Sequence, residues 1–292
     1  MTPRRALLGL HLGALAFGLS GVFGKLALAA PLAIVFGRAL FAVLSLIPFS
    51  RRRAGERPLD RRRLVMLAGA GLLLGAHWLT FFHAVKVSGV AIATLGFASF
   101  PAFTVLLEGL LFRERIRPLE WSLVGLVTLG LVLVTPSFDL ASDATGGLLW
   151  AVASGLLFAL LTLANRATVR GLNPMQAALC QNLAIVLCLL PFAWNAIPGV
   201  RPMDWVWIAA LGVFCTGVAH SLFVSALHVL NARNAALVFA LEPVYGIAFA
   251  WWLFGEQPTP RMFAGGALII AAIVLSSRVK QVPPPLRTAE TA

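Results

Sequence analysis

Long apolar stretches dominate this chain and constrain its fold more than any other feature. The sequence has 292 residues, of which 60% are hydrophobic and only 12% are charged. A helix that spans a bilayer needs about 20 mostly apolar residues. The stretches lack the alternation of apolar and polar residues that membrane β-strands show. Ten spans are predicted: 6–28, 31–50, 64–84, 88–112, 117–136, 146–168, 174–193, 203–227, 233–254 and 260–278.

These spans leave only short connections and tails, so the sequence predicts an all-α polytopic membrane protein without a soluble domain. Seven of the 23 Lys and Arg residues behind the net charge of +12 lie in one arginine-rich loop within residues 51–63. Such loops stay on the cytoplasmic side of a membrane. Ten spans then place both termini in the cytoplasm, with eighteen of the 23 Lys and Arg residues on that side. We therefore expect a bacterial inner-membrane protein, and we attribute the charge to topology, not to nucleic-acid binding.

A segment in the middle of the chain recurs near its end. Both copies hold a proline within an apolar run, a charged end, a proline turn and a second apolar run. The matched pairs lie at one constant offset: Pro101 with Pro243, Glu114 with Glu256, and Pro118 with Pro260.

The repeat extends over the whole chain and gives each half five spans. Because five is odd, the second half must be inverted in the membrane relative to the first. Inverted repeats are a plan of secondary transporters, with the substrate site between the halves near the midplane. We predict a first half over 1–138, a second half over 139–280 and a disordered cytoplasmic tail over 281–292.

Polar and aromatic residues inside the spans are the candidates for a site. Arg38 either snorkels to water or faces a polar interior, and the amides of Gln181 and Asn182 either hold helices together or bind substrate. Glu242 near the centre of a span is costly in lipid and indicates a cavity or a structural hydrogen bond. The predicted substrate cavity comprises Phe17, Arg38, His77, Trp78, Phe82, Ser99, Gln181, Asn182, His220, Glu242 and Tyr245.

Four residues are predicted to let helices bend during gating. Proline within a helix removes a backbone hydrogen bond, and glycine near a turn permits unusual backbone angles. These residues are Pro101, Pro243, Gly89 and Gly212. We expect the third, fourth, eighth and ninth spans to rock and to open the cavity to each side in turn.

The chain shows no pattern of an enzyme or a metal site. Its three cysteines, Cys180, Cys188 and Cys215, lie within apolar runs without metal-ligand spacing. Neither a His-Glu-x-x-His nor a Gly-x-Ser-x-Gly motif occurs, and no nucleotide-binding loop is present. We expect no cofactor and no catalytic activity.

Short motifs in both halves carry a family resemblance. They are Glu242-Pro243-Val244, Gly255-Glu256, Pro260, Gly265-Gly266-Ala267 and, in the first half, Pro101 to Glu114 and Gly125. These motifs resemble those of the EamA-type branch of the drug/metabolite transporter superfamily. The resemblance covers the whole chain and implies ten helices in two inverted halves with alternating access. Within the superfamily, the chain is similar to bacterial amino acid exporters.

The resulting hypothesis is a monomeric secondary transporter in the lipid bilayer that exports amino acids, including aromatic and large apolar ones, or related small metabolites. One alternative is efflux of cationic drugs, because a glutamate and aromatic rings attract cations. An intramembrane enzyme is a remote alternative, and a pore without turnover also remains open.

Overall fold

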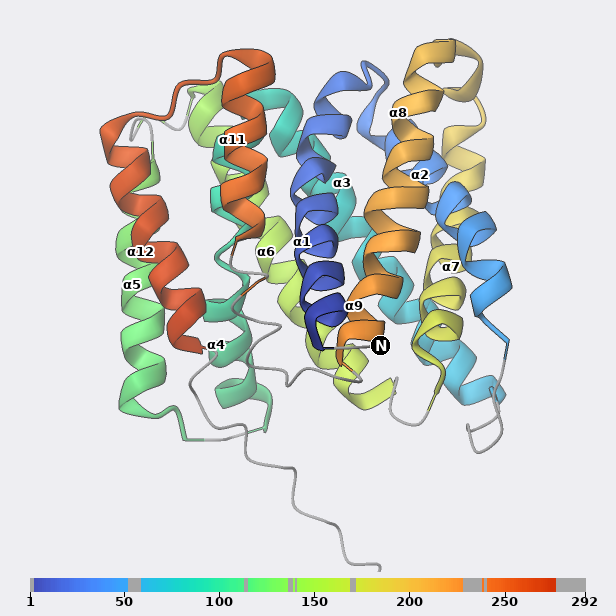
Figure 1. Ribbon diagram of the computed structural model, residues 1–292, viewed down its shortest axis with the longest axis horizontal. Coiled ribbons are helices and arrows are strands. Elements are labelled where there is room, and N and C mark those ends of the chain that lie inside the picture. Colours follow the sequence, from blue (N-terminus) through green and yellow to red (C-terminus); the bar gives the residue numbers. More distant parts are fainter. Residues whose placement is uncertain are drawn as a thin grey trace, which may run out of the picture.

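The structure is a computed structural model in which a bundle of helices stands side by side (Figure 1). It describes residues 3–51, 59–112, 115–135, 139, 141–168, 172–227, 238 and 241–276, and these ranges contain no strand. The predicted tail, most of the basic loop, and Glu114 lie outside the described residues.

The described helices are consistent with the ten predicted spans. The first half supplies α1 (Pro3–Leu26), α2 (Pro31–Leu46), α3 (Arg61–Phe97), α4 (Phe100–Phe112) and α5 (Pro118–Val134), with a short 3₁₀ turn η1 (Ile47–Phe49). The second half supplies α6 (Asp143–Thr168), α7 (Pro174–Ala193), η2 (Ile197–Gly199), α8 (Pro202–Gly212), η3 (Val213–Val218), α9 (Ala219–Leu227), α11 (Glu242–Phe254) and α12 (Pro260–Ser276). Six described helical segments are long and apolar enough to cross a membrane, and shorter apolar helices accompany them.

A single glycine interrupts the helix that joins the third and fourth predicted spans. Helix α3 covers the third span and the beginning of the fourth, and within it only Gly89 departs from helical angles, with φ 85° and ψ 172°. Glycine adopts these backbone angles readily, whereas residues with a Cβ atom are strained there. A Cβ atom at Gly89 would also lie 2.8 Å from a carboxylate oxygen of Glu256. The helix is therefore interrupted at Gly89, and a role of this residue in gating stays a prediction.

We expect Gly89→Ala to destabilise the protein by about 1–3 kcal/mol, because alanine is strained at these backbone angles. Thermal unfolding in detergent measures the effect. Gly69→Ala in the same helix is the matched control, since a Cβ atom at Gly69 meets nothing within 4 Å. The control should be neutral or slightly stabilising, because alanine is the better helix former. Equal melting temperatures for the two variants would contradict the prediction.

The two repeated prolines begin helices where the sequence predicted a bend within one. α3 ends at Phe97, and α4 starts at Phe100, so Pro101 is the second residue of a new helix. Pro243 takes the same place in α11, directly after Glu242. A proline in the first turn costs no hydrogen bond, because the first N–H groups of a helix have no partner within it. The fourth span is thus a broken helix.

Gly212 serves close packing and not the bend that the sequence predicted. It keeps helical angles (φ −70°, ψ −47°), and a Cβ atom there would lie 2.6 Å from the carbonyl oxygen of Arg38. The helix changes only after Gly212, where η3 is one stretch of π-helix. Such stretches occur often at functional sites.

Helices α5 and α12 pack against each other along a seam of small residues. A Cβ atom at Gly130 would lie 2.8 Å from the carbonyl oxygen of Gly265, and one at Gly265 would lie 2.5 Å from that of Gly130. Only glycine permits two helix backbones to approach this closely. Figure 1 shows the pair at one side of the bundle.

Candidate functional site

A cavity of about 1470 Å³ lies between the helices of both halves. It is larger than the 300–1,000 Å³ of typical ligand pockets. Its lining extends from the buried Arg38 and from Glu242 to exposed residues such as Arg115 and Arg117. The exposed residues lie at the face where α1 begins and the α4–α5 connection runs (Figure 1), here named the N-terminal face. The opposite end of the bundle is named the distal face.

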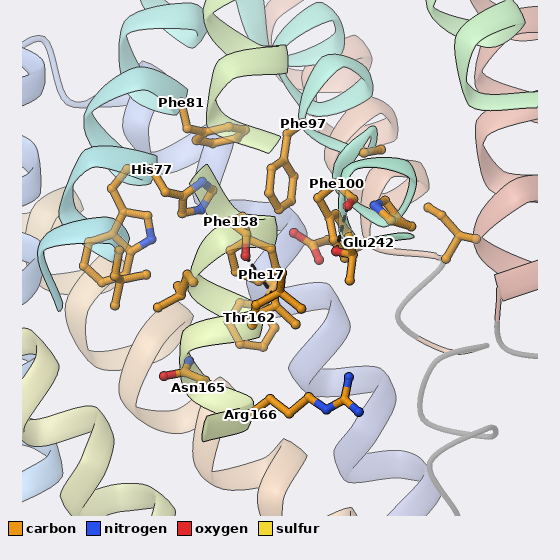
Figure 2. A pocket seen from close by; sticks show the side chains of 18 of the residues that line it. Phe17, His77, Phe81, Phe97, Phe100, Phe158, Thr162, Asn165, Arg166 and Glu242 are labelled. Atoms are coloured by element: carbon orange, nitrogen blue, oxygen red, sulfur yellow. Dashed lines mark hydrogen bonds between the residues drawn. The ribbon is translucent and has the colours of Figure 1, made fainter. Parts of the chain in front are cut away.

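An aromatic cluster forms part of the cavity wall and lies away from Arg166 (Figure 2). Its ring centroids lie 5.0 Å apart for His77 and Phe97, 5.3 Å for Phe97 and Phe158, and 5.1 Å for Phe100 and Phe158. These separations are typical of favourable aromatic pairs. Phe81 completes the cluster, 5.8 Å from Phe97. The cluster offers an apolar, ring-lined surface to a bound molecule.

Helix α6 holds the cluster in place. His77 is buried, and its Nδ1 lies 2.7 Å from Oγ of Ser154. The next residue along α6, Gly155, packs on the break between α3 and α4, since a Cβ atom there would lie 2.7 Å from Oγ of Ser99. Phe97 and Phe100 flank that break. The break therefore turns two aromatic side chains from one span towards the cavity.

Arg38 carries a buried positive charge in the cavity wall. It is 3% exposed, and its Nε donates to Oγ1 of Thr216 at 3.0 Å. Thr216 belongs to η3 and donates in turn to the carbonyl oxygen of Leu211 at 3.0 Å, five residues earlier. The guanidinium carbon lies 4.0 Å from the ring centre of Trp78, a cation–π contact. Arg38 thus faces the polar interior and does not snorkel to the surface.

Glu242 is the acidic counterpart of Arg38. It lines the cavity at the first residue of α11, beside Phe100 (Figure 2). It interacts electrostatically with Arg38, so the two opposite charges lie within one cavity. The N-terminus of a helix also favours a negative charge.

The predicted amides divide into a paired and a partly unpaired group. Gln181 donates from Nε2 to Oδ1 of Asn165 at 2.6 Å, so it joins α7 to α6. Asn182 donates from Nδ2 to the carbonyl oxygen of Ala178 at 2.8 Å, and its Oδ1 has no partner among the described residues. His220 lines the same cavity.

Three predicted cavity residues lie outside the cavity lining. Phe82 is fully buried behind it, against Gly24. Ser99 donates to the carbonyl oxygen of Gly96 at 2.7 Å within the break. Tyr245 packs against α1. Because the predicted spans gave no orientation about the helix axis, sequence could not separate these residues from the lining ones, which are Phe17, Arg38, His77, Trp78, Gln181, Asn182, His220, Glu242, Pro101 and Pro243.

An ion pair stands at the mouth of the cavity. Nη1 of Arg166 donates to Oε1 of Glu108 at 2.7 Å, and both side chains are about one-third exposed. This pair was not predicted from the sequence. Neither were five further residues of the cavity lining: Phe97, Phe100, Phe158, Asn165 and Thr216.

A second ion pair stands at the distal face. Nζ of Lys25, at the end of α1, lies 2.5 Å from Oε1 of Glu256. The same carboxylate accepts the backbone N–H groups of Val90 and Ala91 at 3.1 and 3.0 Å. Those N–H groups are available to the carboxylate because Gly89 interrupts the helix just before them. Glu256 therefore joins α1, α3 and the end of α11.

Two further contacts tie down the end of α1. Lys86 donates to the carbonyl oxygen of Ala27, and Asp204 accepts the N–H of Leu28 at 2.9 Å. Arg201 donates to Asp204 at 2.7 Å, which raises the pKa of Arg201 above its ordinary value. We name four of these residues the distal clamp: Lys25, Lys86, Asp204 and Glu256.

Comparison with known proteins identifies the family. The model of the EamA-like transporter family matches residues 4–135 and again residues 145–278, so one family pattern occurs twice in the chain. A solved structure superposes with a TM-score of 0.64 at 20% identity, covering 93% of this chain and 96% of the other, which shows the same fold.

Curated relatives are transporters. An uncharacterised transporter YxxF of Bacillus subtilis is 24% identical over 267 residues, covering 89% of this chain and 85% of the relative. The pseudopaline exporter CntI of Pseudomonas aeruginosa is 29% identical over 258 residues, covering 85% of this chain and 86% of the relative. With a family model matched over nearly its whole length and a cavity between its helices, the chain belongs to the EamA-like transporter family of multi-pass membrane proteins.

Proposed function

We propose that this transporter exports amino acids, including aromatic and large apolar ones, or related small metabolites, by alternating access. One observation carries the proposal: a single cavity combines a buried arginine, a glutamate and an aromatic cluster. An amino acid presents a carboxylate, an ammonium group and a side chain. Arg38 suits the carboxylate, because a guanidinium binds carboxylates through several parallel N–H groups. The aromatic cluster suits an apolar side chain.

Export of cationic drugs is the second candidate, and Glu242 beside Phe100 favours it. Against it, Arg38 places a positive charge in the same cavity, which repels a substrate that carries only positive charge. The arginine thus favours zwitterionic or anionic substrates. One relative is named as an exporter, which supports the outward direction of transport.

We further propose that residues 1–138 and 139–280 form inverted halves in the inner membrane, with the N-terminal face in the cytoplasm. Two matches of one family model support the duplication. The opposite courses of the equivalent helices α1 and α6 support the inversion (Figure 1). The excess of arginine on that face supports the orientation. On this assignment the cavity opens to the cytoplasm, and the distal clamp closes the outer side. A monomer is sufficient for this mechanism.

Counterflow in liposomes tests the function. Purified protein is reconstituted with unlabelled phenylalanine inside, and entry of labelled phenylalanine, leucine, alanine, a nucleoside and a quaternary ammonium dye is measured. We expect entry of the apolar amino acids at least ten times faster than in empty liposomes. Entry of the dye alone would support the drug-export candidate, and no entry of any amino acid would refute the proposal.

Glu242 is proposed to couple substrate movement to protons, because a substrate carboxylate competes with Glu242 for Arg38. Losing the interaction with Arg38 favours the protonated form of the glutamate. We expect Glu242→Gln to keep counterflow within about threefold and to lose the stimulation by an imposed pH gradient. The measurement is counterflow with and without the gradient in both proteins. An unchanged response to the gradient would remove Glu242 from the coupling.

A further inference from the structure

The hydroxyl group of Thr216 makes two hydrogen bonds, and together they fix its direction. A hydroxyl group has one hydrogen to donate and lone pairs with which to accept. The hydrogen goes to the carbonyl oxygen of Leu211 at 3.0 Å, so Oγ1 is left to accept from Nε of Arg38 at 3.0 Å. A guanidinium nitrogen can only donate. The backbone of α8 therefore orients the oxygen that holds Arg38.

The π-helix η3 directs Thr216 towards Arg38. A threonine in an α-helix bonds back to the carbonyl group three or four residues earlier, whereas Thr216 bonds to the one five residues earlier. The wider turn of a π-helix brings that more distant carbonyl group into reach. Since an α-helix turns by about 100° per residue, a regular α-helix here would rotate Thr216 away from Arg38.

Two glycines hold α2 close to both ends of the π-helix. A Cβ atom at Gly212 would lie 2.6 Å from the carbonyl oxygen of Arg38, and one at Gly217 would clash with Oγ of Ser45. Arg38 and Ser45 are about two turns apart on α2. Because the two backbones approach closely at both points, the position of Arg38 relative to Thr216 is set by the packing of α2 on η3.

The guanidinium group of Arg38 keeps one edge for a ligand. Its bond through Nε to Thr216 is the only hydrogen bond that it makes to the described residues. The ring of Trp78 lies against the group, 4.0 Å from the guanidinium carbon. The N–H groups of the two terminal nitrogens remain, and these nitrogens can bind both oxygens of a carboxylate through parallel bonds. Arg38 and Thr216 both line the cavity, from which a bound molecule meets them.

We propose that Thr216 is a positioning residue for the carboxylate subsite, because it holds Arg38 through Nε and leaves the two terminal nitrogens to bind the substrate carboxylate. This assignment rests on the proposed export of amino acids. Thr216 acts through Arg38, so the loss of its hydroxyl group affects only molecules that use the guanidinium group.

Thr216→Val tests the assignment, because valine keeps the shape of threonine and lacks the hydroxyl group. We measure inhibition of labelled leucine counterflow by phenylalanine and by phenethylamine, which is phenylalanine without its carboxylate. Phenylalanine should inhibit about 5- to 10-fold more weakly, the upper part of the range for one hydrogen bond. Inhibition by phenethylamine should change by less than twofold. Thr216→Ser keeps the hydroxyl group and should stay within twofold of the wild type for both compounds.

A double-mutant cycle shows whether Thr216 acts through Arg38. In the Arg38→Met background, which has no Nε, Thr216→Val should change the initial rate of leucine counterflow by less than twofold. Thr104→Val is the matched control in the wild-type background. Thr104 lines the same cavity, and its Oγ1 donates to the carbonyl oxygen of Phe100 at 2.9 Å on α4, a helix that does not carry Arg38. This variant should leave inhibition by phenylalanine within twofold of the wild type.

Three results would overturn the positioning role while leaving the proposed function in place. The first is equal weakening of both inhibitors in Thr216→Val, and the second is a five- to tenfold loss of rate in the Arg38→Met background as well. The third is unchanged inhibition by phenylalanine in Thr216→Val, or the same loss in Thr216→Ser. If the wild type moves no amino acid, the proposed function fails and the positioning role with it.

Discussion

Arg38→Met will reduce amino acid counterflow by about 30-fold or more and leave the fold intact. Removing one partner of a buried, hydrogen-bonded charge pair costs about 2–5 kcal/mol of binding, or about 30- to several-thousandfold. Methionine keeps most of the side-chain length, so packing against Trp78 is largely retained. Initial rates in liposomes and the midpoint of thermal unfolding are measured together.

Arg38→Lys separates charge from shape. Lysine retains the charge and loses the planar guanidinium that stacks on Trp78 and bonds to Thr216. We expect an intermediate rate, about 10-fold below the wild type. A rate of Arg38→Met within threefold of the wild type, with an unchanged unfolding midpoint, would exclude Arg38 from substrate binding.

Glu256→Gln will open the distal side of the cavity. The variant loses the ion pair with Lys25 and weakens the bonds to Val90 and Ala91. Hydrogen bonds to a charged group contribute about 1.5–3 kcal/mol, which corresponds to about a 10- to 100-fold shift in population. Thr94 lines the cavity, so Thr94→Cys places a reactive thiol there. With Glu256→Gln, this cysteine should react about 10- to 100-fold faster with an impermeant maleimide added at the distal face than it does without that change.

The background for this measurement replaces the three native cysteines by serine. Lys25→Met should give a similar increase, and the double variant little more, because both changes remove one interaction. Gln257→Ala is the control, since Gln257 is the exposed neighbour of Glu256 in the same loop. No acceleration in Glu256→Gln, or an equal one in Gln257→Ala, would contradict a closing role for the distal clamp.

Sequence reasoning predicted the span positions well because lipid imposes a length and an apolar composition on each one. It predicted the positions of the helix breaks less well. It read Pro101 as a bend within one helix, whereas α4 begins beside it. A proline has the same sequence signature in both cases. Whether it lies inside or at the start of a helix depends on contacts such as that of Gly155 with Ser99.

The site was predictable in its chemistry and not in its arrangement. Arg38 and Glu242 stand out because charges within spans are rare and costly. Phe100 does not stand out among 20 phenylalanines, and only the break turns it into the cavity. Glu256 was noted only as the repeat partner of Glu114, and its ion pair with Lys25 was not predicted. Glu114 lies outside the described residues.

The glycine seam of α5 and α12 sets an order for biosynthesis. Gly130 is made before the chain is half complete, while Gly265 is made almost last. During synthesis α5 is therefore made before α12, and Gly130 lacks its packing partner until α12 is inserted. The first half therefore cannot complete its packing until nearly the whole chain has been synthesised. A chain truncated before α12 would leave both halves incompletely packed.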